Sequence, residues 1–126
     1  MYWNCIDDVE GKKSRRELLA AWPAEVARIL FFQALTPQHL DRIGLDRIDF
    51  AFLDAQHTFE SVMEEYQFVE ARQAPGDLIL FDDVTPGLFD GVVAAVNAIR
   101  AKGLYEVSEI GRREERAYAI ARRLTH

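Results

Sequence analysis

Two short apolar runs, each ending on aspartate, most constrain how this chain can fold. Residues 48–54 read IDFAFLD and residues 77–83 read DLILFDD. Both runs are too short to cross a membrane and too evenly apolar to have one wet face, so they predict strands covered on both sides, as in a parallel sheet. Ligands of such open α/β sheets bind outside the carboxyl ends of the strands. We therefore expect Asp54, Asp82 and Asp83 to converge there, around a cation, a proton or a donor-bearing substrate.

Composition limits the alternatives. At 126 residues, the chain is one small domain or a piece of one. Its net charge of −6 argues against general affinity for nucleic acid and for anionic membranes. Cys5 is the only cysteine, which excludes an intrachain disulfide and a thiolate metal site and favours a reducing compartment. The first residues lack the pattern of a signal peptide, so we expect a cytoplasmic protein.

The rest of the chain alternates between helical and strand patterns. Ser14 and Glu17 form a capping-box pattern for a helix to about Trp22. The other expected elements are a strand over residues 28–33, a short helix from Thr36-Pro37 to near Gly44, a helix over about 57–72 and a helix from about 92 to Lys102-Gly103. Residues 105–110 and 117–121 predict an antiparallel hairpin, because the charged connection between them is too short for a crossover helix.

These features resemble the second half of a class I S-adenosylmethionine-dependent methyltransferase. The similarity covers residues 48–121 and is strongest in FLDAQH (52–57) and GDLILFDD (76–83), which match the branch called methyltransferase domain family 24. The resemblance implies an α/β, Rossmann-like, mostly parallel sheet with helices on both faces and a C-terminal antiparallel hairpin. In that fold the strand order is 3-2-1-4-5-7-6.

The resemblance leaves the first two strands and the glycine-rich turn of that fold unmatched. Each of the seven glycines is isolated and explicable as a turn or a helix end. We therefore expect a single partial methyltransferase domain, with residues 1–27 as the loop and helix after strand 2 and residues 28–126 as strands 3 to 7. Such a sheet exposes edges. Either the 28–33 strand moves to pair with the 48–54 strand, or a homo-oligomer or a separate N-terminal half fills the gap.

The resemblance also suggests site residues. It implies that Asp54, Asp82 and Asp83 bind a divalent cation such as Mg²⁺, which lowers the pKa of an acceptor hydroxyl. His57, three residues past Asp54, is a candidate proton acceptor or metal ligand, with a capping or solvated histidine as the alternative. The cofactor S-adenosylmethionine is expected near Asp54, Ala55 and His57, and the acceptor near Asp83 and Thr85. The alternatives are that these aspartates cap helices and that Asp83 and Thr85 are plain turn residues.

Two functional hypotheses remain open. The first is methyl transfer from S-adenosylmethionine to an oxygen or nitrogen of a small-molecule acceptor, with or without a metal and with a separate N-terminal half. The second is a non-catalytic remnant or assembly subunit that binds another subunit through exposed sheet edges. A metal-dependent hydrolase fits the order of strands and helices less well.

Overall fold

A computed structural model describes residues 13–31, 40–54, 56–113 and 116–125 of the chain. The chain divides into two compact units, Met1–Gln33 and Ala34–His126. The first contains two short helices, α1 (Arg15–Leu18) and α2 (Pro23–Val26). The predicted capping box is confirmed, since the Ser14 amide donates to Glu17 Oε2 (2.8 Å) and the Glu17 amide donates to Ser14 Oγ (3.3 Å).

Two predictions for the first unit are wrong in detail. The helix that begins after Ser14 ends at Leu18 rather than near Trp22. Residues 28–31 form turn and coil instead of a strand, because the amides of Arg28 and Ile29 bond back to Glu25 and Val26 and continue the turns of α2. The last two residues of that predicted strand, 32 and 33, lie outside the described residues.

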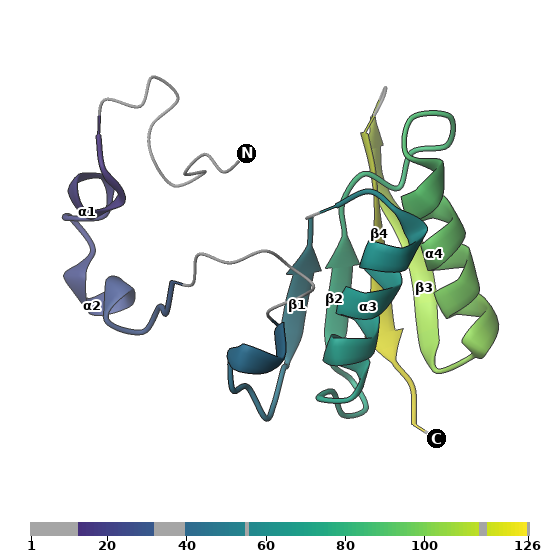
Figure 1. Cartoon of the computed structure of the whole chain (residues 1–126), viewed down its shortest axis with the longest axis horizontal. Helices are drawn as coiled ribbons and strands as arrows, with labels where there is room; N and C mark the ends of the chain where they lie inside the picture. Colours follow the sequence, from purple (N-terminus) through teal and green to yellow (C-terminus); the bar gives the residue numbers. More distant parts are fainter. Residues whose placement is uncertain (1–12, 32–39, 55, 114–115, 126) are drawn as a thin grey trace. The chain divides into compact units, whose positions relative to one another are not determined.

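The second unit contains a four-stranded sheet (Figure 1). Its strands are β1 (Phe50–Leu53), β2 (Leu78–Phe81), β3 (Tyr105–Arg113) and β4 (Arg116–Arg123), in the spatial order β1-β2-β4-β3. β1 and β2 are parallel, whereas β4 is antiparallel to both β2 and β3. The predicted α/β fold with a C-terminal antiparallel hairpin is therefore confirmed, and the order matches strands 4-5-7-6 of the expected fold.

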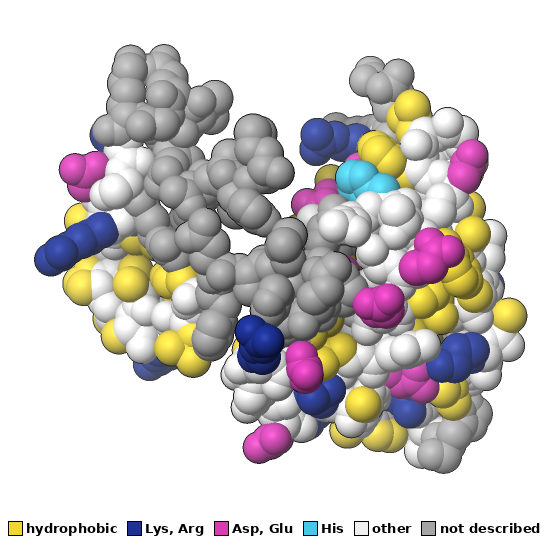
Figure 2. Space-filling view, viewed as in Figure 1, with side chains coloured by type: hydrophobic (Ala, Val, Ile, Leu, Met, Phe, Trp, Pro, Cys, Tyr) yellow, Lys and Arg dark blue, Asp and Glu magenta, His cyan; other side chains and the backbone are white. Residues whose placement is uncertain are grey.

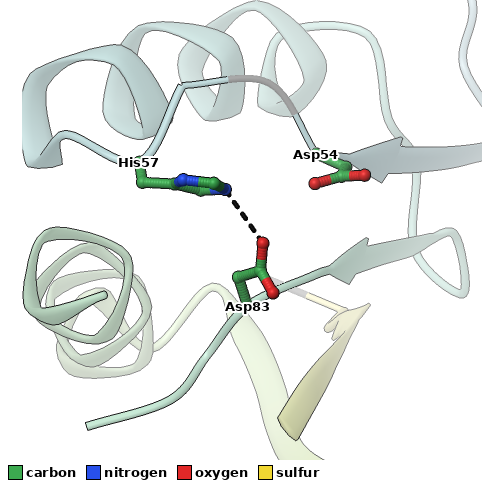
Figure 3. A group of neighbouring side chains, drawn as sticks. All are labelled: Asp54, His57 and Asp83. Atoms are coloured by element: carbon green, nitrogen blue, oxygen red, sulfur yellow. Dashed lines mark ion pairs between the residues drawn. The ribbon is translucent and has the colours of Figure 1, made fainter. Parts of the chain in front are cut away.

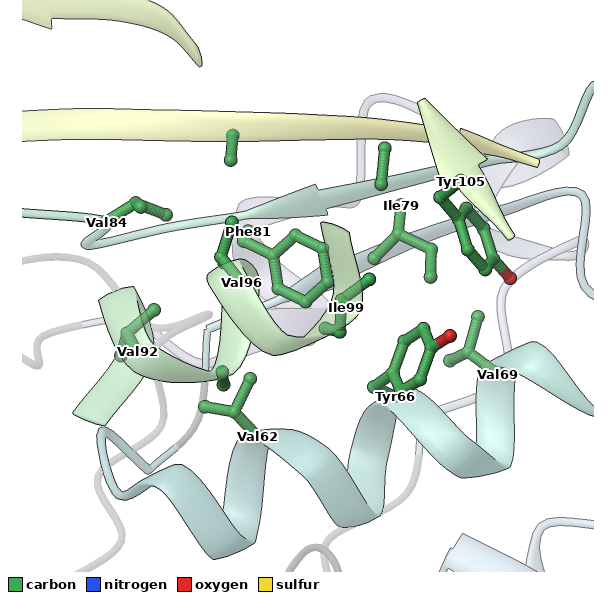
Figure 4. Packing of buried hydrophobic residues seen from close by; sticks show 13 residues of the cluster. Val62, Tyr66, Val69, Ile79, Phe81, Val84, Val92, Val96, Ile99 and Tyr105 are labelled. Atoms are coloured by element: carbon green, nitrogen blue, oxygen red, sulfur yellow. The ribbon is translucent and has the colours of Figure 1, made fainter. Parts of the chain in front are cut away.

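Two amphipathic helices cover one face of this sheet. They are α3 (Phe59–Glu70) and α4 (Asp90–Lys102), which ends as predicted at Gly103, in the left-handed conformation (φ 70°). Figure 4 shows the core between the helices and the strands, and the largest fully buried side chains in it are those of Tyr66, Ile79, Phe81, Val96 and Ile99. The solvent-facing sides of the helices carry charges of both signs (Figure 2). Within the described residues of this unit, α3 and α4 both lie on this one face of the sheet (Figure 1).

A pair of charged side chains fixes the end of the sheet at which β1 and β2 begin. The Arg47 guanidinium forms a two-pronged ion pair with the Asp77 carboxylate, whose second oxygen lies 2.9 Å from Arg47 Nη2. Asp77 is buried and also accepts from the Ala74 amide. This interaction joins the segments that lead into the two strands.

For the segment before β1 the sequence predicts a short helix from Thr36-Pro37 to near Gly44, and the structure describes this segment from residue 40 onward. A single 3₁₀ turn, η1 (Leu40–Arg42), precedes Gly44, which has φ 71°. The predicted cap at Thr36 and Pro37 lies outside the part of the chain that the structure describes. The Ile48 amide then bonds to the carbonyl of Arg72 at the end of α3, and this bond leads the chain into β1.

Candidate functional site

The carboxyl ends of β1 and β2 lie side by side. Leu53 is paired with Phe81, and the Asp82 amide donates to the Leu53 carbonyl at 3.2 Å. Asp54 and Asp82 are therefore the next residues on two neighbouring parallel strands. The backbones of Asp54 and Asp82 therefore lie together at the carboxyl end of the sheet, as the sequence predicts.

Three side chains converge at the carboxyl ends of β1 and β2, those of Asp54, His57 and Asp83. One oxygen or nitrogen atom of each lies within 4.8 Å of the others (Figure 3). His57 Nε2 is 2.9 Å from Asp83 Oδ2, and the two side chains are 39% and 20% exposed. The group is thus open to solvent on one side and has the spacing that a single cation or a shared proton requires.

The backbone of Asp83 directs its carboxylate toward His57. Asp83 has φ 55° and is the non-glycine residue with positive φ in the described part of the chain. Aspartate tolerates this left-handed region better than most side chains do. Its amide donates to Asp82 Oδ1 at 2.7 Å. One oxygen of Asp82 therefore bonds to the backbone of the turn, and Asp82 does not belong to the three-residue group that could share an ion.

The negative charges at this edge act on Asp54. Partial burial raises the pKa of the Asp54 carboxyl, and the carboxylates of Asp82 and Asp83 raise it further, while His57 and Arg116 lower it. The ionised form of Asp54 is consequently less favourable here than in an isolated, exposed aspartate. A bound cation would remove that disadvantage.

The loop that carries His57 is ordered by hydrogen bonds at the start of α3. Thr58 is the N-cap of α3, and its Oγ1 accepts from the Ser61 amide at 3.2 Å. The Ser61 hydroxyl lies 2.9 Å from both Thr58 Oγ1 and Gln56 Oε1. This network fixes the residues on both sides of His57, so the alternative that His57 itself caps the helix is wrong.

Two further residues contact His57 from the start of α4. The rings of His57 and Phe89 have centroids 4.4 Å apart. A Cβ atom on Gly91 would lie 2.5 Å from the His57 carbonyl oxygen and 2.9 Å from the Phe59 amide nitrogen. Gly91 lies in the first turn of α4, consistent with its interpretation as a helix-end glycine, and it also permits close backbone contact, which was not predicted from the sequence. Its position in an otherwise apolar helical pattern was the available signal.

Thr85 and Ala55 are the other residues predicted to belong to the site. Thr85 Oγ1 accepts from the Ala117 amide at 3.3 Å and thereby joins the loop after β2 to β4. Ala55 lies outside the described residues. Roles for these residues, and for Asp82, in binding cofactor, acceptor or metal remain predictions.

Two hollows adjoin Asp54. A small one beneath the cluster is lined by Leu53, Asp54, Gln56, His57, Val62, Glu65, Phe81, Asp82 and Val92. A groove of about 460 Å³ runs along β1, and the described residues that line it are apolar except for Asp54 and Glu65. The buried Glu65 borders both hollows.

Comparisons with known proteins give a family and a fold. The family model described as "Methyltransferase domain" matches residues 4–84. A solved protein from Klebsiella pneumoniae superposes with a TM-score of 0.72 at 17% identity, over 94% of this chain and 60% of its own. An O-methyltransferase from Bacillus cereus in complex with SAH superposes with a TM-score of 0.66 at 16% identity, over 86% of this chain and 56% of its own. The O-methyltransferase TomG from Streptomyces achromogenes, involved in tomaymycin synthesis and in complex with SAM, superposes with a TM-score of 0.68 at 16% identity. The match covers 92% of this chain and 57% of TomG.

The chain spans 56 to 60% of the length of these solved structures. At such low identity the structural likeness establishes the fold alone. No curated protein matches the sequence. Within the described residues, no helix is both long and apolar enough to cross a lipid bilayer.

Proposed function

This chain belongs to the methyltransferase domain family, and from that premise we propose that it takes part in S-adenosylmethionine-dependent methyl transfer to an oxygen or nitrogen of a small-molecule acceptor. The observation that carries the proposal is the convergence of Asp54, His57 and Asp83 at the carboxyl ends of β1 and β2. Methyl transfer to a hydroxyl requires removal of its proton and in-line positioning of its oxygen. A histidine beside two carboxylates is suited to remove that proton.

His57 is the proposed proton acceptor. Its Nε2 faces the Asp83 carboxylate, so Asp83 orients the ring and stabilises the positive charge that the imidazole gains when it takes a proton. Nδ1 is then the atom that accepts the proton from the acceptor group. A general base in this position contributes roughly 10²- to 10⁴-fold to the rate.

The same cluster fits a divalent cation. Asp54 and Asp83 each offer a carboxylate oxygen, and these oxygens lie within 4.8 Å of each other and of a ring nitrogen of His57. Mg²⁺ prefers carboxylate oxygens and retains several water molecules, so two carboxylates at an open edge match its needs. A cation there would offset the repulsion that raises the pKa of Asp54. It would also lower the pKa of an acceptor hydroxyl.

The described residues fit the methyl donor only in part. S-adenosylmethionine, when bound, supplies an electrophilic methyl group. The groove beside β1 offers apolar surface and two carboxylates, Asp54 and Glu65, but its described lining has no other polar side chain to hold the amino-acid and ribose groups. We propose that the donor site is completed by a separate N-terminal half or by a second copy.

The test uses the full chain in its measured oligomeric state, with S-adenosylhomocysteine titrated calorimetrically in the presence and absence of Mg²⁺. Transfer of a labelled methyl group to a panel of catechols, sugars and amines follows. We expect transfer that falls at least about 100-fold in His57→Ala and is unchanged in Glu64→Gln, an exposed carboxylate of α3. Folded protein that binds the cofactor product yet methylates nothing, or equal rates with and without His57, would contradict the proposal.

An assembly subunit is the second candidate function, and the outer edge of β1 favours it. No described strand pairs with this edge. Ala51 and Leu53 pack toward the core, so Phe50 and Phe52 point to the other face, where they are 56% and 51% exposed. An unpaired edge next to exposed aromatic rings is a template for a strand from another polypeptide.

Light scattering after size exclusion tests this second function. We expect wild-type protein to form an oligomer or to bind a separately expressed N-terminal half, and the double variant Phe50→Ser/Phe52→Ser to lose that association. Leu88→Ser, which changes an equally exposed residue in the loop before α4, is the matched control. A wild-type monomer that binds no such partner would exclude the assembly function.

A further inference from the structure

The start of α4 lies unusually close to the segment that carries His57. The Gly91 Cα faces the backbone of residues 57–59, and a Cβ there would be 2.5 Å from the His57 carbonyl oxygen. Real Cβ atoms do not approach backbone oxygen so closely, so any larger residue would force α4 and this segment apart. The contact involves backbone on both sides, which leaves no flexible side chain to absorb the change.

The side chain of Phe89, just before α4, contacts the side chain of His57. It lies 4.4 Å from the His57 imidazole, centroid to centroid, at an interplanar angle of 46°. Phe89 itself is half-buried and packs against the core cluster, so its position is determined by the core. The His57 ring thus has one neighbour that is fixed by packing and a second, Asp83, whose Oδ2 lies 2.9 Å from Nε2.

We propose that Phe89 and Gly91 are positioning residues that hold the His57 imidazole with Nε2 toward Asp83. This inference rests on the proposed role of His57 as proton acceptor. Gly91 sets the distance between α4 and the backbone of His57, and Phe89 restricts the rotation of the ring. Together they fix which ring nitrogen faces the carboxylate and leave Nδ1 for the acceptor. The start of α4 is therefore part of the site, although it contributes no catalytic group.

The position of His57 can be measured without any substrate. When Asp83 accepts a hydrogen bond from Nε2–H, the neutral imidazole is held in one tautomer. Long-range ¹H–¹⁵N NMR of the ring distinguishes that tautomer from a mixture, at a pH above the ordinary imidazole pKa. Because this signal does not depend on methyl transfer, it separates a failure of the positioning role from a failure of the proposed function.

The experiment compares three variants of the full chain. Val93→Ala is the control, because Val93 is on the same helix and packs against the core. We expect wild type and Val93→Ala to show the Nε2–H tautomer, and Gly91→Ala and Phe89→Ala to show a mixture. If Gly91→Ala does not fold, Phe89→Leu, which keeps the apolar volume but removes the ring, takes its place. An unchanged His57 spectrum in the folded variants, or an equal change in Val93→Ala, would overturn the inference.

Discussion

Removal of the Asp83 carboxylate should cost stability through two separate terms, and the structure allows each to be assigned. One is the ion pair with His57, whose heavy atoms are 2.9 Å apart. The other is the left-handed backbone conformation of Asp83, with φ 55°. Alanine loses the ion pair and also adopts that conformation poorly. Asparagine loses the charge but tolerates the conformation.

The expected magnitudes follow from exposure and conformation. His57 is 39% exposed, so the pair is worth about 1 kcal/mol, between the values for surface pairs and for buried charged hydrogen bonds. A non-glycine, non-Asx residue in the left-handed region costs about 1 kcal/mol. Asp83→Ala should therefore lower the free energy of unfolding by about 2 kcal/mol. Relief of repulsion with Asp54 acts in the opposite direction and is common to both substitutions, so it cancels when they are compared.

A double-mutant cycle with His57→Ala, measured by urea unfolding, separates the two terms. In the His57→Ala background, Asp83→Ala should cost only the conformational part, about 1 kcal/mol, and Asp83→Asn should cost close to nothing. If Asp83→Ala costs the same in both backgrounds, the ion pair contributes nothing. If alanine and asparagine are equivalent once His57 is absent, the conformational argument is wrong.

Two pH-dependent predictions follow from the other aspartates. The Arg47 guanidinium lowers the pKa of Asp77, so this carboxylate stabilises the fold above the ordinary aspartate pKa of about 4, and that stabilisation is lost as the pH falls through the folded-state value. Unfolding measured from neutral to acidic pH should show wild type losing its advantage over Asp77→Asn, and a constant difference would contradict this. The pKa of Asp54 is raised, so its favourable contribution is present at low pH and disappears as the pH rises. Asp54→Asn should be more stable than wild type at neutral pH without divalent cations, and a less stable variant would refute the electrostatic reasoning.

Much of the second unit was predictable from sequence because local signals agreed with the tertiary structure. The apolar runs that end at Asp54 and Asp82 become neighbouring parallel strands, and the charged connection after Ile110 becomes a hairpin. Strand spacing and the rule for the carboxyl ends of parallel strands were enough to bring Asp54 and Asp83 together. In these regions one physical interpretation dominated each pattern.

The remaining features depend on contacts that a single sequence does not encode locally. Residues 28–31 have strand-like composition, but the amides of Arg28 and Ile29 form turn hydrogen bonds to the end of α2 instead. The left-handed turn at Asp83 could not be read from two adjacent aspartates. The role of Gly91 depends on the distance between α4 and the His57 loop, which is a tertiary quantity.

The most direct test of the candidate site is a titration of the folded full chain with Mn²⁺, monitored by the NMR signals of the His57 ring. These signals should broaden at low Mn²⁺ concentration in wild type and in the Glu64→Gln control. The selective broadening should be lost in Asp54→Asn and Asp83→Asn, because each removes one charged oxygen ligand. Broadening that is absent in wild type, or that persists unchanged in both aspartate variants, would contradict a cation site at the ends of β1 and β2.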